Sequence, residues 1–435
     1  MKRKLCKEIL ESEDSIFLLK GRIISRRNLG KIVFMTLRDG SDEAQISLRQ
    51  DTLRTNYENA KKEIKMGDII ELKGSPFVSE SGEKTIDVEN YKVYSKCNKK
   101  LPDKHKGLDR RNSFDNRGLD IMINHDSFHR FKKINKIVKE IRMFLYNQGF
   151  QEVDTGILKK VTDTSAARDF TSYSIYLKRD LYLRKSMEMR LKQLLVGGLE
   201  NIFEMGKDFR NESISSEFHP EFTAIELYQN YANYIDILNL VKGMLNHLNS
   251  TIGEPSSKPT QAEEVKLYDF ILENTKLDAR TCDLSKIKSN ISPNRLKDYG
   301  KHPEFRGLYI YDLFLSLLDN FSDRNVILHG VPKEVSVLGK SFDDEPSLVE
   351  EFRYFVKGRS FCYGVTELTD PQEQKERLEA QARYLEKSTD NNDNIFLDML
   401  NFGLPPCAGL GLGLERLLMI YTQQENIKDV IYFPL

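Results

Sequence analysis

The sequence has no tryptophan, only five cysteines and no long hydrophobic run. The cysteines show no paired spacing, which argues against a zinc site and a disulfide framework and favours a reducing compartment. No apolar run approaches the ~18 residues of a membrane-spanning helix, and the N-terminal segment lacks the apolar core of a signal peptide. These absences predict a soluble cytoplasmic protein with no membrane partner. The cysteines are Cys6, Cys97, Cys282, Cys362 and Cys407.

The chain also carries no net charge, because 66 lysines and arginines balance 66 aspartates and glutamates. The overall charge therefore indicates no polyanionic partner. The distribution is uneven, however: residues 1–117 hold 26 basic and 19 acidic side chains, and residues 92–117 hold nine basic and three acidic ones. This basic run is either a solvated linker or a segment that binds nucleic-acid phosphates.

The N-terminal part has the pattern of a small β-barrel. Five short segments alternate with period two, and a helix-like segment, residues 52–67, separates the third from the fourth. This order predicts a closed barrel of the OB type, a fold that often binds single-stranded nucleic acid by stacking bases on aromatic rings. The predicted strands are residues 17–27, 31–40, 43–50, 68–78 and 84–95.

The pattern changes after the basic run. Residues 129–150 show apolar side chains at helical spacing and reach a stop signal at Gly149. Strand-like and helix-like segments then mix without repeats, and a glycine-rich turn precedes a last helix in GLGLERLLMIYT. We therefore predict an α+β chain with an OB-type domain (1–97), a basic linker (98–118) and a mostly antiparallel sheet flanked by helices (119–435). The predicted strands of that sheet are residues 179–185, 201–212, 223–231, 350–358 and 360–369.

Three long stretches in this second part identify a family. Residues 181–212, 219–234 and 403–422, in this order behind the barrel, resemble the class II lysyl-tRNA synthetases, and the likeness extends to the terminal DVIYFPL. It implies an anticodon-binding OB barrel followed by an antiparallel class II catalytic domain. It also implies a homodimer that joins lysine to tRNA through lysyl-adenylate, using ATP and Mg²⁺.

The resemblance implies a nucleotide site. Arg210 matches the arginine that contacts the substrate carboxylate and the α-phosphate, and Arg416 matches the arginine that lies against ATP. A guanidinium fork suits both tasks. Phe222 would stack on adenine, Glu212 would face the base, and three glycines would let the backbone approach the nucleotide. The ATP-binding positions are Arg210, Glu212, Phe222, Gly409, Gly411, Gly413 and Arg416.

The resemblance also implies a lysine pocket and a tRNA-binding face. A buried ammonium needs carboxylate partners, and several positions match the family residues around the substrate amines. On the barrel, Phe34 would stack an anticodon base, although its local pattern fits a core residue equally well. The amino-acid-binding positions are Glu188, Arg210, Glu226, Tyr228 and Glu367, and the tRNA-binding positions are Phe34, Arg38 and Gln45.

The sequence departs from the family at the phosphate end of the site. Glu217 and Phe218 stand where the family has Arg-His, which removes a clamp on the triphosphate. Arg353 and Ser360 stand where two glutamates of the family hold Mg²⁺, so the sequence predicts no metal ligand at either position. Arg353 is instead the third catalytic candidate beside Arg210 and Arg416, as a guanidinium in place of the metal.

Two further departures affect the amino-acid pocket and the dimer. Tyr363 and Val365 replace an asparagine and a phenylalanine of the lysine pocket. Gly156 replaces the proline of the first class II motif, so we expect a looser turn in a homodimer. Two hypotheses follow: a working, divergent lysine–tRNA ligase, or an inert paralogue that binds tRNA or a partner subunit.

Overall fold

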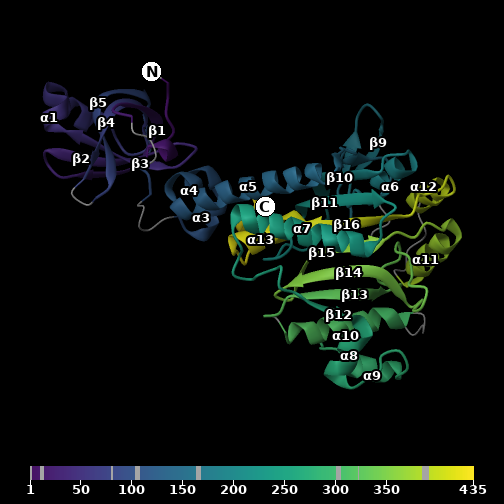
Figure 1. Ribbon diagram of the computed structural model, residues 1–435. Helices are drawn as coiled ribbons and strands as arrows, with labels where there is room; N and C mark the ends of the chain where they lie inside the picture. The colour runs from purple at the N-terminus through teal and green to yellow at the C-terminus, as the bar shows by residue number, and fades with distance from the viewer. Residues whose placement is uncertain are drawn as a thin grey trace. The chain divides into compact units, whose positions relative to one another are not determined.

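The computed structural model describes residues 2–9, 14–79, 82–102, 108–162, 168–299, 305–321, 323–384 and 391–435. The chain divides into two compact units, Met1–Phe128 and His129–Leu435. Figure 1 labels their helices and strands. In the described part of the chain, no helix has the length and apolar character that crossing a membrane requires.

The first unit contains the predicted OB barrel. Its strands close in the order β1-β2-β3-β5-β4, and helices α1 and α2 lie between β3 and β4. The alternation read from the sequence corresponds to burial, because Val33, Met35 and Leu37 point into the core while the residues between them are partly exposed. The elements are β1 (Phe17–Asn28), β2 (Ile32–Arg38), β3 (Glu43–Arg49), α1 (Gln50–Leu53), α2 (Tyr57–Glu63), β4 (Ile69–Val78) and β5 (Lys84–Ser95).

The basic run continues into helices that belong to this first unit. Its described residues include α3 (Arg110–Asp115) and α4 (Arg117–Ile123). Arg117 is almost fully buried and pairs with Asp120 at 3.1 Å. The end of the run is therefore folded rather than a solvated chain, while residues 103–107 lie outside the described part of the protein.

The second unit is built on an eight-stranded sheet with the order β12-β13-β14-β15-β16-β11-β10-β6 (Figure 1). Its six central strands are antiparallel, and only the outer pairs β12·β13 and β10·β6 are parallel. The predicted fold class is confirmed. The strands are β6 (Gln151–Glu152), β10 (Asn201–Phe209), β11 (Glu221–Asn230), β12 (Glu263–Lys266), β13 (Val326–Pro332), β14 (Leu348–Val356), β15 (Arg359–Thr366) and β16 (Cys407–Gly413).

Helices on both sides of this sheet leave one face open at its centre. Helix α7 (Tyr234–Ile252) packs against β14, β15 and β16, and α13 (Leu414–Thr422) packs against β11. Gly364 of β15 faces Ile237 of α7. Because neighbouring residues of a strand point to opposite faces of the sheet, Tyr363 points to the face away from α7. The other helices are α5 (His125–Asn147), α6 (Glu188–Val196), α8 (Leu267–Thr275), α9 (Leu284–Ser289), α10 (Arg306–Asp319), α11 (Pro371–Tyr384) and α12 (Asn391–Leu400).

Two local predictions are settled by the backbone. Helix α5 ends at Asn147 and the chain turns at Gly149, whose φ of +83° is left-handed, so the predicted helix terminus is confirmed. The glycine-rich segment before the last helix is not a turn. It forms strand β16 between β15 and β11, and α13 begins only at Leu414.

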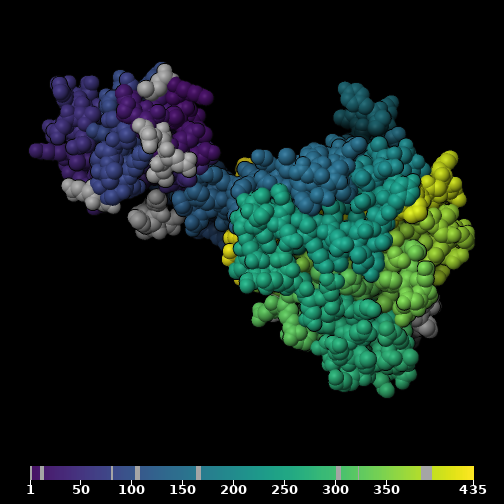
Figure 2. Space-filling model, in the orientation of Figure 1, coloured from purple at the N-terminus to yellow at the C-terminus, as the bar shows by residue number. Residues whose placement is uncertain are grey.

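A small three-stranded sheet stands beside the large one. Its order is β7-β9-β8, and Figure 2 shows the β8–β9 hairpin projecting from the surface of the second unit. The hairpin tip is apolar, since the side chains of Ile175 and Tyr176 are 80% and 97% exposed. The strands are β7 (Leu158–Lys159), β8 (Thr171–Ser174) and β9 (Arg179–Leu183).

Candidate active site

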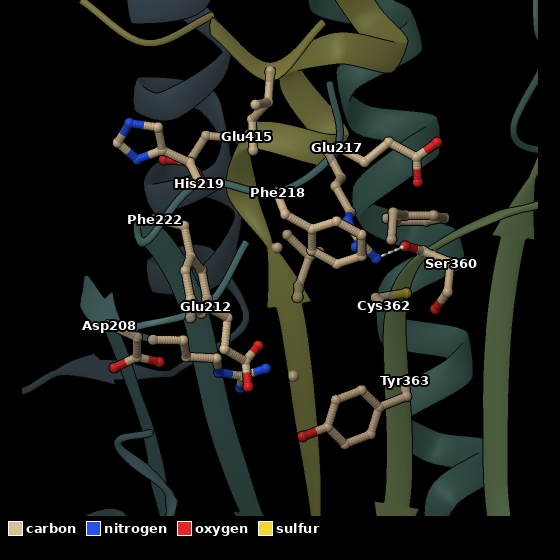
Figure 3. Close-up of a pocket in the computed structure, with 18 of the residues that line it drawn as sticks. Asp208, Glu212, Glu217, Phe218, His219, Phe222, Ser360, Cys362, Tyr363 and Glu415 are labelled. Atoms are coloured by element: carbon tan, nitrogen blue, oxygen red, sulfur yellow. Dashed lines mark hydrogen bonds between the residues drawn. The ribbon is translucent and has the colours of Figure 1, made fainter. Parts of the chain in front are cut away.

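A pocket of about 330 Å³ opens over the exposed face of the central strands (Figure 3). Side chains from β10, β11, β15, β16 and α13 line it, together with the loop between β10 and β11. That loop is the middle of FRNESISSEFHPEFT. Its two ends are joined by a hydrogen bond from Arg210 N to Pro220 O (2.8 Å), and Ile427 N donates to Ser216 O (2.7 Å).

Two arginines of the pocket lie against aromatic rings. The Arg210 guanidinium lies 5.2 Å from the ring centre of Phe222, and the Arg416 guanidinium lies 5.2 Å from that of Phe218. Arg416 also donates from Nη1 to Ser360 O at 2.6 Å. Phe218 therefore covers a face of Arg416 that a nucleotide base would need (Figure 3).

Glu217 is not an isolated acid in this pocket. Its Oε1 accepts from Arg359 Nε at 2.9 Å, across the opening between the β10–β11 loop and the start of β15. Burial lowers the pKa of Arg416, and the Glu217 carboxylate opposes that shift while Arg210 and Arg359 add to it. Two guanidinium groups, those of Arg359 and Arg416, therefore interact with this one carboxylate.

The deep end of the pocket holds a buried carboxylate with an oxygen that has no partner. Glu226 Oε1 accepts from the Ser186 hydroxyl at 3.2 Å, while Glu226 Oε2 is buried without a hydrogen-bond partner among the described residues. Burial, and then the charges of Asp208 and Glu188, raise the pKa of Glu226 well above its usual value. A bound cation would relieve both effects.

The other two carboxylates assigned to the lysine pocket already have a cation. Lys192 is fully buried on α6, and its Nζ lies 2.7 Å from Glu188 Oε1 and 2.5 Å from Glu367 Oε2. Burial raises the pKa of Glu367 to about 7, and Lys192 limits that rise. Tyr228 lies beside the same ammonium, whose Nζ is 5.9 Å from its ring centre.

Comparison with known proteins agrees with this geometry. Residues 109–435 match the family of tRNA synthetases class II (D, K and N), and residues 17–94 match the OB-fold nucleic acid binding domain. The chain belongs to the class II tRNA synthetases of the D, K and N group. It is 33% identical to a protein named lysine–tRNA ligase from Staphylococcus aureus strain MW2, over 98% of this chain and 89% of the relative. The protein of the same name from strain Mu3 is equally similar over the same shares of both chains.

The glycines of this class II site have a packing role that the sequence did not reveal. A β-carbon on Gly411 would lie 2.6 Å from Tyr363 Cε1, and one on Gly409 would overlap the Tyr228 ring. Gly409 and Gly411 therefore make room for tyrosines of the neighbouring strands, β15 and β11. Gly411 and Gly413 also line the pocket. Close contact between their backbone and a bound nucleotide stays a prediction.

The positions that the family uses for magnesium do not fit that ion in this chain. Arg353 donates from Nε to Glu351 Oε1 and from Nη1 to the Tyr311 hydroxyl, both at 2.6 Å, and it is not among the pocket-lining residues. Ser360 offers its backbone oxygen to Arg416. Mg²⁺ requires several oxygen ligands in octahedral geometry, and these two positions do not supply them.

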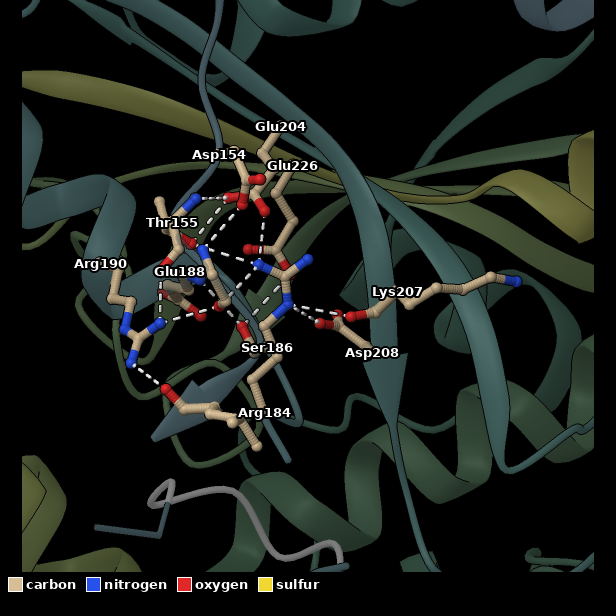
Figure 4. Close-up of polar contacts among 12 residues, drawn as sticks. Asp154, Thr155, Arg184, Ser186, Glu188, Arg190, Glu204, Lys207, Asp208 and Glu226 are labelled. Carbon is tan, nitrogen blue, oxygen red and sulfur yellow. Dashed lines mark hydrogen bonds and ion pairs between the residues drawn. The ribbon is translucent and has the colours of Figure 1, made fainter. Parts of the chain in front are cut away.

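The first class II motif is held more firmly than its glycine suggests. Gly156 has a φ of +76°, which a proline cannot adopt, and its oxygen accepts from Arg184 (3.2 Å) and Arg190 (2.8 Å). Arg184 is itself buried between Glu204 and Asp208 (Figure 4). The expectation of a looser turn is therefore not supported by these contacts.

The barrel residues assigned to tRNA differ in exposure. Phe34 is partly exposed on β2, outside the barrel core, as a stacking residue has to be. Gln45 is also partly exposed, and its amide bonds Glu83 and Thr85. Arg38 is only 6% exposed, because its guanidinium pairs with Glu43 and donates to carbonyl oxygens at the end of α4. These contacts favour a positioning role for Arg38.

Two residues of the site were missed in the sequence. Lys192 could have been found, because it follows Glu188 by four residues on a helix and such pairs meet on one face. Arg359 offered no such signal, since its partner Glu217 lies in a distant loop and only the sheet brings the two together.

Proposed function

We propose that this chain activates lysine with ATP and transfers it to tRNA. The observation that supports this most directly is the buried Glu226 carboxylate, whose Oε2 is unpartnered at the deep end of a pocket that holds Arg210. Glu188 and Glu367 share the ammonium of Lys192, so Glu226 is the acid best placed to pair with a substrate ammonium. The relatives named lysine–tRNA ligase point to the same substrate.

The proposed reaction has two steps. A carboxylate oxygen of lysine attacks the α-phosphorus of ATP, and the bond from that phosphorus to the leaving pyrophosphate breaks. A terminal ribose hydroxyl of tRNA then attacks the lysyl carbonyl, loses its proton and releases AMP. Arg210 lines the same pocket as Glu226 and Arg416, and a preorganised guanidinium there would stabilise the charge that develops on the α-phosphate. Mg²⁺ would enter with ATP.

Lysine-dependent exchange of pyrophosphate into ATP tests this proposal. We expect exchange with lysine and none without an amino acid. Absence of exchange with every amino acid would favour the inert paralogue, which whole-chain similarity to ligases does not support. Exchange with another amino acid would identify a different substrate for the pocket that Tyr363 lines. The five free cysteines fit a reaction in the reducing cytoplasm.

Phe34→Ala is expected to weaken tRNA binding to the whole chain by roughly 1–3 kcal/mol, the contribution of one stacked base. Filter binding or fluorescence anisotropy at fixed salt measures the change. Phe77→Ala is a control for general loss of aromatic surface, since Phe77 lies on another strand, against Arg49. If Phe34→Ala binds tRNA like the parent, the ring serves only to pack the barrel.

We also propose a homodimer that uses the β8–β9 hairpin. Tyr173, Ile175, Tyr176 and Leu177 expose 56–97% of their surface on this projection, and exposed apolar clusters of this kind mark interfaces. Tyr176→Asp is expected to shift the chain toward monomer in sedimentation velocity at micromolar concentration. Lys178→Asp, next in the same turn, is the control for added negative charge. A parent chain that sediments as a monomer would contradict the dimer.

A further inference from the structure

Arg359 stands where two strands turn toward the pocket. The turn between β14 and β15 is formed by Lys357 and Gly358, both with positive φ, and Arg359 is the first residue of β15. From this position its guanidinium reaches the Glu217 carboxylate at 2.9 Å. An arginine that binds a carboxylate in this geometry can bind a phosphate oxygen at the same place. The carboxylate is planar and the phosphate is tetrahedral, but the oxygens of both anions accept hydrogen bonds from the guanidinium group.

A second cavity continues from the nucleotide pocket on the far side of this ion pair. It measures about 370 Å³, and Lys357, Arg359 and Arg416 contribute its cations. Glu217, Phe361 and Arg416 line both cavities, so the ion pair stands at their boundary. The cations on this side can receive a chain of phosphates that enters from the first pocket.

The ion pair at the boundary is easily exchanged. The Arg359 side chain is 48% exposed and that of Glu217 is 36% exposed, and an ion pair with this exposure to water contributes little to stability. A polyphosphate carries more charge than one carboxylate and gains correspondingly more from the same guanidinium. Displacing Glu217 would also carry Phe218, its neighbour in the loop, away from Arg416.

We propose that Arg359 binds the distal phosphates of ATP and the pyrophosphate that leaves, and that Glu217 occupies this anion site until the nucleotide displaces it. The inference rests on the proposed function and names a residue of the same site. The inference explains why this chain has Glu217 where the family has a phosphate-binding arginine. Arg359 of β15 would bind the phosphates instead, and Glu217 would pair with Arg359 when no nucleotide is bound.

Equilibrium binding of ATP, AMP and pyrophosphate to purified full-length variants tests the inference. Arg359→Gln is expected to weaken binding of ATP and pyrophosphate about tenfold or more, the scale of a lost charge-assisted hydrogen bond, and to change AMP binding less than about twofold. Glu217→Gln removes the competing anion and is expected to tighten ATP binding about three- to tenfold, again with AMP unchanged.

The control is Arg295→Gln, which breaks an ion pair of similar exposure with Asp319, and neither residue lines either cavity. It should leave all three affinities as in the parent, and thermal melting checks that every variant is folded. The inference is overturned if Arg359→Gln binds ATP with the affinity of the parent, or if Glu217→Gln binds ATP more weakly than the parent. The proposed function stands in either case. A parent that binds neither ATP nor AMP overturns both.

Discussion

Arg210→Ala is expected to slow lysine-dependent pyrophosphate exchange about 10²–10³-fold, the effect of removing one preorganised donor from a developing negative charge. Arg210 lines the same pocket as Glu226 and Arg416, and its guanidinium lies 5.2 Å from the Phe222 ring centre. The loss should fall mainly on the exchange rate at saturating lysine and ATP, because the contact strengthens as charge builds on the α-phosphate.

Arg210→Lys is the informative companion to that variant. It keeps the charge but loses the planar fork, so we expect an exchange rate between those of the parent and Arg210→Ala. Arg295→Gln again controls for a lost surface arginine. If Arg210→Ala exchanges pyrophosphate at the parent rate, the residue does not contact the reacting phosphate, and the assignment of this pocket to adenylation is wrong.

Lys192→Met is expected to lower the free energy of unfolding by about 3–5 kcal/mol at pH 8, the cost of leaving buried carboxylates without their cation. Lys192 is fully buried and pairs with Glu188 and Glu367. Urea unfolding followed by circular dichroism measures the change. The matched control is Lys242→Met, because Lys242 pairs with Glu264 on the surface and should change stability by less than about 0.5 kcal/mol.

The deficit in Lys192→Met should depend on pH. The pKa of Glu367 is raised to about 7 by burial even with Lys192 present, and without Lys192 it must rise further. A carboxyl group whose pKa is raised in the folded state becomes protonated as the pH falls. The neutral acid destabilises the folded state less than a buried carboxylate does. The deficit should therefore shrink from pH 8 to pH 5, and Glu188→Gln with Glu367→Gln should restore much of it at pH 8. A deficit that does not vary with pH would show that lost packing, not charge, causes it.

Sequence reasoning was most reliable where local pattern and burial coincide. The alternation through Val33, Met35 and Leu37 is the pattern of a half-buried barrel strand, and these three side chains are buried. Gly149 ends a helix because its backbone is left-handed. The richness in glycine of the segment with Gly409, Gly411 and Gly413 predicts a turn, yet the segment forms a central strand. The large side chains that fill the space beside it come from other strands.

The sequence by itself determined the barrel and the antiparallel sheet of the second unit, since each depends on periodicity or on a long stretch of contiguous residues. Only the tertiary structure decided which charged side chains form ion pairs with one another. Lys192 pairs with both Glu188 and Glu367, Arg359 pairs with Glu217, and Glu226 keeps an oxygen without a hydrogen-bond partner among the described residues. Ion pairs between distant segments depend on a few ångströms of separation and on burial, and a linear sequence carries neither until the strands have paired.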